Sequence, residues 1–384
     1  MKWSRVKTVA FKEVIEIWRD KLYLSMAFMI PTMMMVVLGF GLSMDVEKIP
    51  FVVVDYDQSQ QSRDYLHRFI DSRYFDYQGQ TAHEKEAEPL MIQNKIRFIL
   101  VIPSGFQRDL LQGQRVKIQP VIDGLFTYQA KVVKGYVSAI NANYNQELMT
   151  QWLKKKQGMN AHEIAALLEP VRLETRYLYN EKLSSLWSTG SGMIMLVMLM
   201  APAILTALGV VREKESGSIF NIYASTVSRS EFIIGKILPY VLISMFNLLI
   251  LSWMALVLFG VPFKGDPLLY LTASLFFVSC STGVGMLVST LVKTQASAAL
   301  ITMLGTMIPG MMMSGLLMPV NSMEAAARVE AHLLPAMYQL NIVWGSFLKG
   351  QGWPELGTNV MVLGGYAVFL WSLSIWRFRK RVTS

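Results

Sequence analysis

The sequence predicts an α-helical polytopic membrane protein with six transmembrane helices and an inserted α/β domain outside the cytoplasm. Three observations lead to this fold class. Of the 384 residues, 53% are hydrophobic and only 16% are charged, whereas soluble domains carry about 25% charged residues. Six apolar stretches are each long enough for a membrane helix of about 20 residues. A polar segment, residues 43–187, separates the first two stretches and is long enough to bury a core of its own.

Six uncharged stretches define the expected spans. None of them contains Asp, Glu, Lys, Arg or His. They are residues 22–42, 188–211, 237–261, 267–292, 296–318 and 356–376. We do not expect the first stretch to be a cleaved signal peptide, because its apolar core is longer than the usual ~7–15 residues and no small-x-small cleavage pattern follows it.

The basic residues indicate how the chain is oriented. Segments 1–21, 212–236 and 377–384, together with Lys293, hold 15 Lys and Arg residues against six acidic ones. Segment 43–187 holds 18 basic and 17 acidic residues. Because basic loops stay on the cytoplasmic side, we expect both termini to be cytoplasmic and segment 43–187 to lie outside. The net positive charge therefore reflects the excess of basic residues in the cytoplasmic segments of a membrane protein, and it does not indicate a nucleic-acid-binding surface.

Residues 1–21 predict a helix at the cytoplasmic membrane surface. Between residues 3 and 20, apolar residues return every three or four positions with basic residues between them, a pattern typical of an interfacial helix. Two interpretations remain open. The helix is either a membrane-surface anchor or an elbow helix that contacts a cytoplasmic partner.

Segment 43–187 predicts a small α/β domain. Apolar runs at 51–56, 97–102 and 116–122 predict strands, and each run ends in turn-forming residues. Residues 60–70 and 126–156 predict helices between and after them. The single cysteine, Cys280, lies in an apolar span, so neither a disulfide framework nor a thiolate metal site is expected.

Residues 319–355 are expected to re-enter the membrane without crossing it. Pro319, Pro335 and Pro354 divide this segment into two short amphipathic pieces, 321–334 and 336–349. A broken backbone is tolerated at membrane depth only where protein buries it. We therefore expect the segment to pack against the helix bundle.

Catalytic and nucleotide-binding motifs are missing from the sequence. The nearest approach to a P-loop, Gly260–Gly265, is followed by Asp266-Pro267 where Lys-Ser/Thr is required. The four histidines are scattered, and His83–Glu88 reads as a solvated helix face. Ion-driven transporters usually carry ionisable residues inside their spans. A transport cycle in this chain would have to be powered from outside the membrane.

The cytoplasmic loop 212–236 holds the strongest functional candidates. Its charged start is followed by apolar residues that can share one helical face. It is either a plain polar connector or an amphipathic helix that docks into the groove of a partner. The residues that we assign to partner coupling are Arg212, Glu213, Glu215, Gly217, Ile219, Phe220 and Tyr223.

The order of several motifs resembles that of ABC-2 type transporter permeases. The cytoplasmic motifs are Arg212-Glu213 with Gly217, and Ser228–Glu231 with Gly235-Lys236. A motif of the C-terminal part is Ser314-Gly315 to Pro319, followed by Pro335. Motifs of the outer segment, Val54–Ser59, Val101–Phe106 and Ile122–Gly124, resemble the bacterial branch with a large domain between spans one and two, the YbhS/YhhJ kind. The resemblance covers essentially the whole chain.

This resemblance implies the permease subunit of an exporter in the bacterial inner membrane, a transport subunit and not an enzyme. Such a permease moves hydrophobic or amphiphilic substrates, including drug-like compounds and cations, out of the cytoplasm or inner membrane. Separate cytoplasmic ATPase subunits would bind ATP and Mg²⁺, and this chain would need no cofactor. A second permease, identical or paralogous, and a periplasmic adaptor protein would complete the path. The alternative function is a non-transporting membrane receptor whose outer domain binds a ligand.

Residues inside the spans suggest packing contacts and a substrate path. Small residues recur at four-residue spacing at Ser279/Gly283 and Ser281/Gly285, which is typical of helices that approach closely in lipid. Met307 and Met311 lie one turn apart in a methionine-rich span. They are either packing residues or part of an apolar path for the substrate. Asn247 is the most polar mid-span residue and is either an interhelical hydrogen-bond partner or a part of that path.

Overall fold

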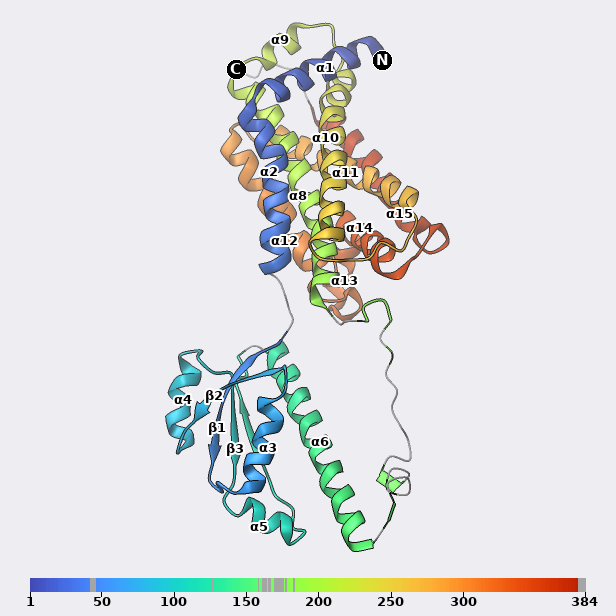
Figure 1. The fold of residues 1–384 in the computed structure, drawn as a ribbon. Helices are drawn as coiled ribbons and strands as arrows, with labels where there is room; N and C mark the ends of the chain where they lie inside the picture. The colour runs from blue at the N-terminus through green and yellow to red at the C-terminus, as the bar shows by residue number, and fades with distance from the viewer. Residues whose placement is uncertain are drawn as a thin grey trace. The chain divides into compact units, whose positions relative to one another are not determined.

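The computed structural model describes residues 1–41, 46–125, 127–157, 159–160, 164, 167–168, 176, 178–181 and 184–378. Its contacts divide the chain into two units. The helical unit comprises Met1–Met44 and Arg176–Ser384, and the inserted unit comprises Asp45–Thr175. Each unit is described by itself below (Figure 1).

Six helices in the described part of the helical unit are long and apolar enough to cross a membrane. This confirms the predicted number of spans. They are α2 (Lys21–Gly41), α8 (Ser185–Glu215), α10 (Arg229–Val257), α11 (Pro267–Leu291), α12 (Gln295–Met313) and α15 (Trp353–Arg377). The shorter helices are α1 (Trp3–Arg19), α9 (Ile219–Ala224), η1 (Val320–Ser322), α13 (Ala325–His332), α14 (Pro335–Trp344) and η2 (Gly345–Lys349).

Helix α8 forms the centre of the helical unit. Almost all of its apolar length is buried, and it packs against α2, α10, α11, α12 and α14. Its methionines, including Met193 and Met198, are fully enclosed by these neighbours. In helices α2, α12 and α15, by contrast, only 22% of the apolar stretch is buried, as expected for helices that face lipid or another protein.

Two helices extend beyond the spans that the uncharged stretches define. The last turn of α8 contains Arg212 and Glu213, and the first two turns of α10 contain Glu231 and Lys236. Much of the expected loop 212–236 is therefore helical. Placing the end of a span at its first charged residue makes the predicted helix too short. A membrane helix continues into the membrane–water interface, where its charged residues find partners. Segment 319–355 likewise consists of short helices that pack against α8, α11 and α15.

The inserted unit is built on a four-stranded sheet with strand order β2-β1-β3-β4. The strands are β1 (Ile49–Asp55), β2 (Phe75–Gln80), β3 (Phe98–Ile102) and β4 (Gln119–Ile122). β1 pairs in parallel with both β2 and β3, whereas β4 is antiparallel to β3. The helices are α3 (Gln60–Ile70), α4 (Glu84–Ile92), α5 (Phe106–Leu111) and α6 (Thr127–Gln157).

Alternate side chains of β1 and β3 pack into two hydrophobic cores, one on each face of this sheet. Phe51 and Phe98 pack with residues of α3 and α6 on one face, while Val52 and Ile99 pack with Ala87 of α4 on the other. Strands covered on both faces read as continuous apolar runs. This is why β1 and β3 were predictable, and why the edge strand β2, which buries only Phe75, was not.

Candidate functional site

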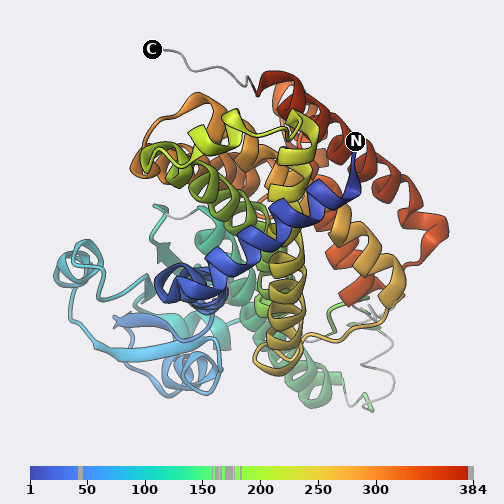
Figure 2. The same cartoon turned by 90° about the horizontal axis from the view of Figure 1, so that it is seen from above.

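Helix α1 lies across the end of the bundle at which α9 is found and the chain begins (Figures 1 and 2). It packs mainly against α10. The side that faces α10 buries Val6, Glu13 and Ile17, whereas Trp3 and Trp18 on the outer side are exposed. A buried carboxylate between apolar residues needs charged or hydrogen-bonding partners.

Those partners come from α10. Lys236 Nζ lies 2.5 Å from Glu13 Oε2, and the Tyr240 hydroxyl donates a hydrogen bond to Glu13 Oε1. All three side chains are almost completely buried. Burial raises the pKa of Glu13 overall, although the bonds from Lys236 and Tyr240 oppose part of that rise. Because both carboxylate oxygens accept hydrogen bonds, the arrangement fits the ionised form of Glu13.

Glu213 at the end of α8 joins the same group. Its Oε1 lies 3.1 Å from Lys236 Nζ and 2.7 Å from Lys12 Nζ, and Lys12 also pairs with Glu16 at 3.3 Å. Burial alone would lower the pKa of Lys12, but its bonds to Glu213 and Glu16 raise it overall. We name Lys12, Glu13, Glu16, Glu213 and Lys236 the elbow cluster. It connects α1, α8 and α10.

A second set of bonds fixes the start of α1 to the start of α10. Ser228 and Glu231 form a capping box, in which each side chain bonds the backbone N–H of the other residue. Glu231 Oε1 also accepts a hydrogen bond of 2.6 Å from the backbone N–H of Lys2. Arg5 donates to the Thr226 carbonyl at 2.6 Å. Helix α1 is thereby held at both the α8 end and the α10 end of the hairpin formed by α8, α9 and α10.

The structure gives each predicted coupling residue a different setting within this hairpin. Arg212 pairs with Asp20 at 2.6 Å, and Glu215 accepts a hydrogen bond of 2.8 Å from the backbone N–H of Gln295. Gly217 has a φ of +75°, a left-handed conformation that favours glycine.

In α9, Ile219 is buried, whereas Phe220 is 51% exposed. The Tyr223 side chain lies outside the part of the chain that the structure describes. Among the described side chains of this short helix, Phe220 is therefore a large apolar one at the surface.

Of the elbow cluster, the sequence analysis assigned only Glu213 to coupling, and it missed Lys12, Glu13, Glu16 and Lys236 as site residues. A signal for Glu13 does exist, because it lies seven residues after Val6 and four before Ile17, on the face that the helix buries. Lys236 belongs to the Gly-Lys pair of the motif series described above. Nothing in one sequence pairs the two, since 223 residues separate them.

The small residues of α11 lie against two different helices. A Cβ atom at Gly285 would lie 2.1 Å from the Ala203 carbonyl oxygen of α8, and one at Gly283 would lie 3.0 Å from Leu370 Cβ of α15. The Ser279 carbonyl accepts a hydrogen bond of 2.8 Å from the Trp371 indole of α15. The Ser281 hydroxyl is buried and bonds the Phe277 carbonyl within its own helix at 3.1 Å.

The residues assigned to a substrate path lie on two helices, α12 and α10. Met307 and Met311 are half-buried on α12, and Met311 packs against the main core. Asn247 of α10 is buried and its Nδ2 donates to the Ala27 carbonyl of α2 at 2.8 Å. This bond is an interhelical contact of the kind that membrane helices use for association.

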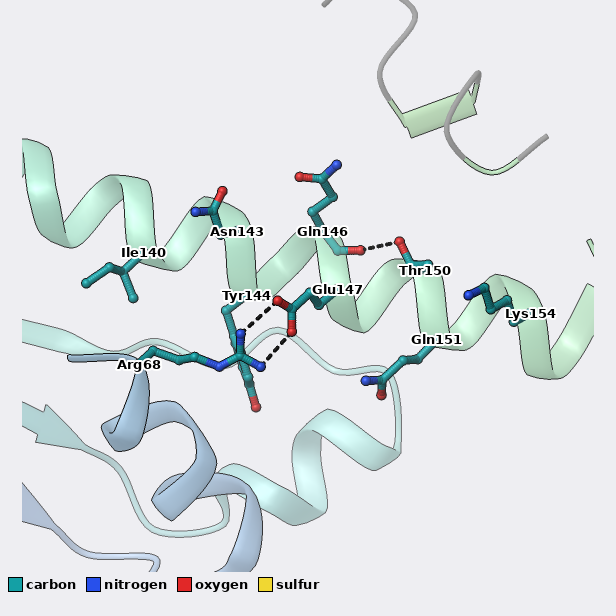
Figure 3. A pocket seen from close by; sticks show the side chains of 9 residues that line it. All are labelled: Arg68, Ile140, Asn143, Tyr144, Gln146, Glu147, Thr150, Gln151 and Lys154. Carbon is teal, nitrogen blue, oxygen red and sulfur yellow. Dashed lines mark hydrogen bonds and ion pairs between the residues drawn. The ribbon is translucent and has the colours of Figure 1, made fainter. Parts of the chain in front are cut away.

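The inserted unit carries a polar pocket of about 650 Å³ along α6 (Figure 3). Arg68 of α3 reaches α6 with a two-pronged bond to Glu147, at 2.7 and 2.6 Å. The hydrogen bond from Arg68 lowers the pKa of Glu147. The other lining residues are Ile140, Asn143, Tyr144, Gln146, Thr150, Gln151 and Lys154. The pocket is open and amide-rich, and its residues were not predicted as a site.

Comparison with known proteins identifies the family. The model of the ABC-2 family transporter proteins matches residues 21–376. The probable multidrug ABC transporter permease YbhS of Escherichia coli (strain K12) is 27% identical over 383 residues, covering 100% of this chain and 98% of that protein.

Two further permeases of the same strain are similar. The probable multidrug ABC transporter permease YbhR is 24% identical over 381 residues, covering 96% of this chain and 98% of that protein. The inner membrane transport permease YhhJ is 25% identical over 342 residues, covering 87% of this chain and 86% of that protein.

The family match runs from the start of α2 to the last turn of α15 and includes the inserted unit. It decides between the two functions left open by the sequence, in favour of a permease and against a receptor without transport activity. ABC-2 permeases act together with ABC ATPase subunits, and they are transport subunits rather than enzymes. This chain belongs to the ABC-2 family of transporter proteins and is a membrane permease.

Proposed function

We propose that this permease exports hydrophobic or amphiphilic compounds, including drug-like molecules and cations, from the cytoplasm or the inner membrane of a bacterium. Similar proteins named as multidrug permeases over nearly their whole length support this substrate class. The scarcity of ionisable residues along the apolar cores of the spans supports a power source in separate subunits. ATP and Mg²⁺ would be bound by those subunits, and this chain carries no nucleotide-binding motif.

We place both termini and the α8–α9–α10 hairpin in the cytoplasm, and the inserted unit in the periplasm. The charge distribution supports this orientation, since the short segments at the hairpin end hold 15 basic and six acidic residues. The exposed tryptophans of α1 fit a helix that lies in the headgroup region. A periplasmic inserted unit would be free to meet an adaptor protein.

The observation that carries the coupling proposal is the elbow cluster. Its bonds join α1, which leads directly into span α2, to both arms of the hairpin. We expect the ATPase to contact the hairpin at α9, where Phe220 is exposed. A displacement of α9 on ATP binding would then reach α1 and α2 through Glu213 and Lys236.

Six spans form half of a transport path of the usual ABC kind, so we expect a second permease, identical or paralogous, to complete it. Met307, Met311 and Asn247 stay our candidates for the path. α12 exposes one side, and Met307 and Met311 are half-buried beside it, which fits a helix at the boundary between two permeases.

The decisive experiment is co-purification of the permease with its ATPase. Replacing Phe220 by Asp puts a charge on the exposed apolar contact while leaving the buried Ile219 in place. We expect normal membrane insertion, loss of the co-purified ATPase and loss of substrate-stimulated ATP hydrolysis. Leu111→Asp, at an apolar residue of the inserted unit that is even more exposed, is the control and should keep the ATPase. Normal ATPase binding by Phe220→Asp would reject the proposed contact.

A further inference from the structure

The last turn of α8 ends in four consecutive charged residues, and their contacts reach different parts of the bundle. Arg212 holds the end of α1 through Asp20, and Glu213 contributes to the elbow cluster. Lys214 and Glu215 instead bind the two sides of the turn that joins α11 to α12. These last two contacts connect the hairpin to helices that the elbow cluster does not reach.

Lys214 binds the end of α11. Its Nζ donates a hydrogen bond to the Ser289 carbonyl, which is one of the last four carbonyl groups of a helix that ends at Leu291. The last four carbonyl groups of a helix have no partner within it, and they carry the negative end of the helix dipole. The ammonium group therefore satisfies a carbonyl and places a positive charge at the negative helix end.

Glu215 binds the start of α12. Its Oε1 accepts a hydrogen bond of 2.8 Å from the backbone N–H of Gln295, the first residue of that helix, and its Oε2 accepts one of 2.5 Å from the Gln295 side chain. Thr294 caps the N–H of Ser297 in the same turn. Glu215 thus supplies a partner that the helix's own cap does not, and it places a negative charge at the positive helix end.

The order of the two charges on α8 matches the order of the two helix ends. The turn between them consists of three residues, 292–294, which reach at most about 10 Å, so the two contacts leave it little slack. Between them, Val292 is buried in the same hydrophobic cluster as Val211 of α8. The turn is therefore fixed to the end of α8 by a polar bond on each side and an apolar contact in the middle.

We propose that Lys214 and Glu215 are positioning residues that tie the start of α12 to the α8–α9–α10 hairpin, so that a displacement of α9 on ATP binding also moves α12. This inference rests on the proposed function, in which α9 contacts the ATPase, and it adds a second output to it. The first output runs through the elbow cluster to α1 and α2. The second reaches the helix that carries Met307 and Met311, the candidates for the substrate path.

The test measures distances between spin labels in the full-length permease, which is labelled, placed in nanodiscs and assembled with its unlabelled ATPase. Exposed residues carry the labels: Ser216→Cys at the end of α8, Lys293→Cys in the α11–α12 turn and Trp376→Cys at the end of α15. Cys280→Ser removes the natural cysteine. The pair 216/293 reports whether the turn follows α8, and the pair 216/376 reports movement of the hairpin. Each pair is measured without nucleotide and with ATP and orthovanadate.

The variant Lys214→Met/Gln295→Pro removes the bonds on both sides of the turn and leaves Glu215 in place. Proline lacks the N–H that binds Glu215 and is well tolerated at the first position of a helix. The preceding residue, Thr294, already has the extended backbone that proline requires, with a φ of −118° and a ψ of 147°. The substitution is therefore expected to release the turn without unfolding α12.

With Lys214 and Gln295 intact, we expect one narrow 216/293 distance in both nucleotide states, because the turn follows α8. In Lys214→Met/Gln295→Pro the same distance should shift or broaden when ATP binds. Lys214→Arg keeps the charge and should restore the constant distance. Thr290→Val is the matched control beside Ser289, because the Thr290 hydroxyl bonds a carbonyl of its own helix at 2.7 Å, and it should leave the distance constant.

Two results would overturn the proposal and leave the hairpin coupling intact. One is a constant 216/293 distance in Lys214→Met/Gln295→Pro while the 216/376 distance changes with ATP. The other is a 216/293 distance that already changes with ATP when both residues are intact. If neither distance changes in the double variant, the hairpin does not move, and the proposed coupling is rejected together with this inference. Gln295→Pro alone, at a partly exposed residue, keeps the test valid if the double variant fails to fold.

Discussion

Lys236 of α10 and Glu13 of α1 form an ion pair at 2.5 Å, and both side chains are almost completely buried. Glu213 of α8 shares the same ammonium group at 3.1 Å. A lysine held between two carboxylates from two other helices fixes the position of α1 relative to the hairpin. Removing it leaves two buried carboxylates with less compensation, which is far more costly than never having buried them.

We therefore expect Lys236→Met to destabilise the helical unit by about 3–5 kcal/mol, the usual effect of breaking a buried pair. Thermal unfolding in detergent, followed by the loss of monodisperse protein, measures the change. The double variant Glu13→Gln/Lys236→Met should be more stable than Lys236→Met alone. Lys12→Met, at a half-exposed partner of the same cluster, should cost about 1 kcal/mol or less. Equal losses for Lys12→Met and Lys236→Met would contradict the special role of the buried lysine.

A graded series of glycine substitutions tests the close packing of α11 against α8 and α15. Gly285→Leu forces a side chain into the backbone of α8, and we expect it to abolish the folded protein. Gly283→Leu meets the Leu370 side chain, which has some room to move, and should cost about 1–3 kcal/mol. Gly305→Leu on α12, where a Cβ atom would meet nothing within 4 Å, is the control and should fold normally. The yield of folded protein checks this order, and three equal yields would refute it.

The methionine pair of α12 tests the substrate path. Replacing Met307 and Met311 together by Ala removes flexible apolar surface, and we expect an altered substrate spectrum with preserved basal ATP hydrolysis. Export profiles of several chemically different compounds provide the measurement. Met29→Ala/Met33→Ala, an exposed pair one turn apart on α2, is the matched control. An equal fall for every compound, or no change, would assign Met307 and Met311 to packing.

Asp123 should make the stability of the inserted unit depend on pH. The backbone N–H of Leu125 and the Arg97 guanidinium, which lies 2.6 Å from Asp123, lower the pKa of this carboxyl below its usual 3.8. Because the folded pKa is the lower one, the stabilisation is complete above the unfolded pKa and is lost as pH falls through the folded pKa.

Urea unfolding of the inserted unit within the full-length protein, followed by amide hydrogen exchange, should show this loss in the acid range below about pH 4. Asp123→Asn should already lack the stabilisation at neutral pH and show a flatter acid profile. An unchanged acid profile in Asp123→Asn would assign the pH dependence to other carboxyl groups.

The six spans were predictable because a bilayer demands uninterrupted apolar length, which one sequence displays directly. Strands β1 and β3 were predictable for a related reason, as both of their faces are buried. Strand β2 was missed because five of its six residues are not buried. The site was predictable only in its local part. The hairpin residues lie close together in the sequence, whereas the pairing of Glu13 with Lys236 depends on a fold that brings together residues 223 positions apart.

Helix α8 begins at Ser185, and in its first turn the Ser188 carbonyl accepts a hydrogen bond of 2.9 Å from the Trp344 indole of α14. Its last turn, which ends at Glu215, contributes Glu213 to the elbow cluster. Its 31 residues make a rod about 46 Å long. A helix resists compression along its axis, while thioether side chains let neighbouring surfaces slide. A push at Glu213 would therefore travel along α8, through the turn that contains Pro202, toward the contact of Ser188 with Trp344 at the far end of the bundle.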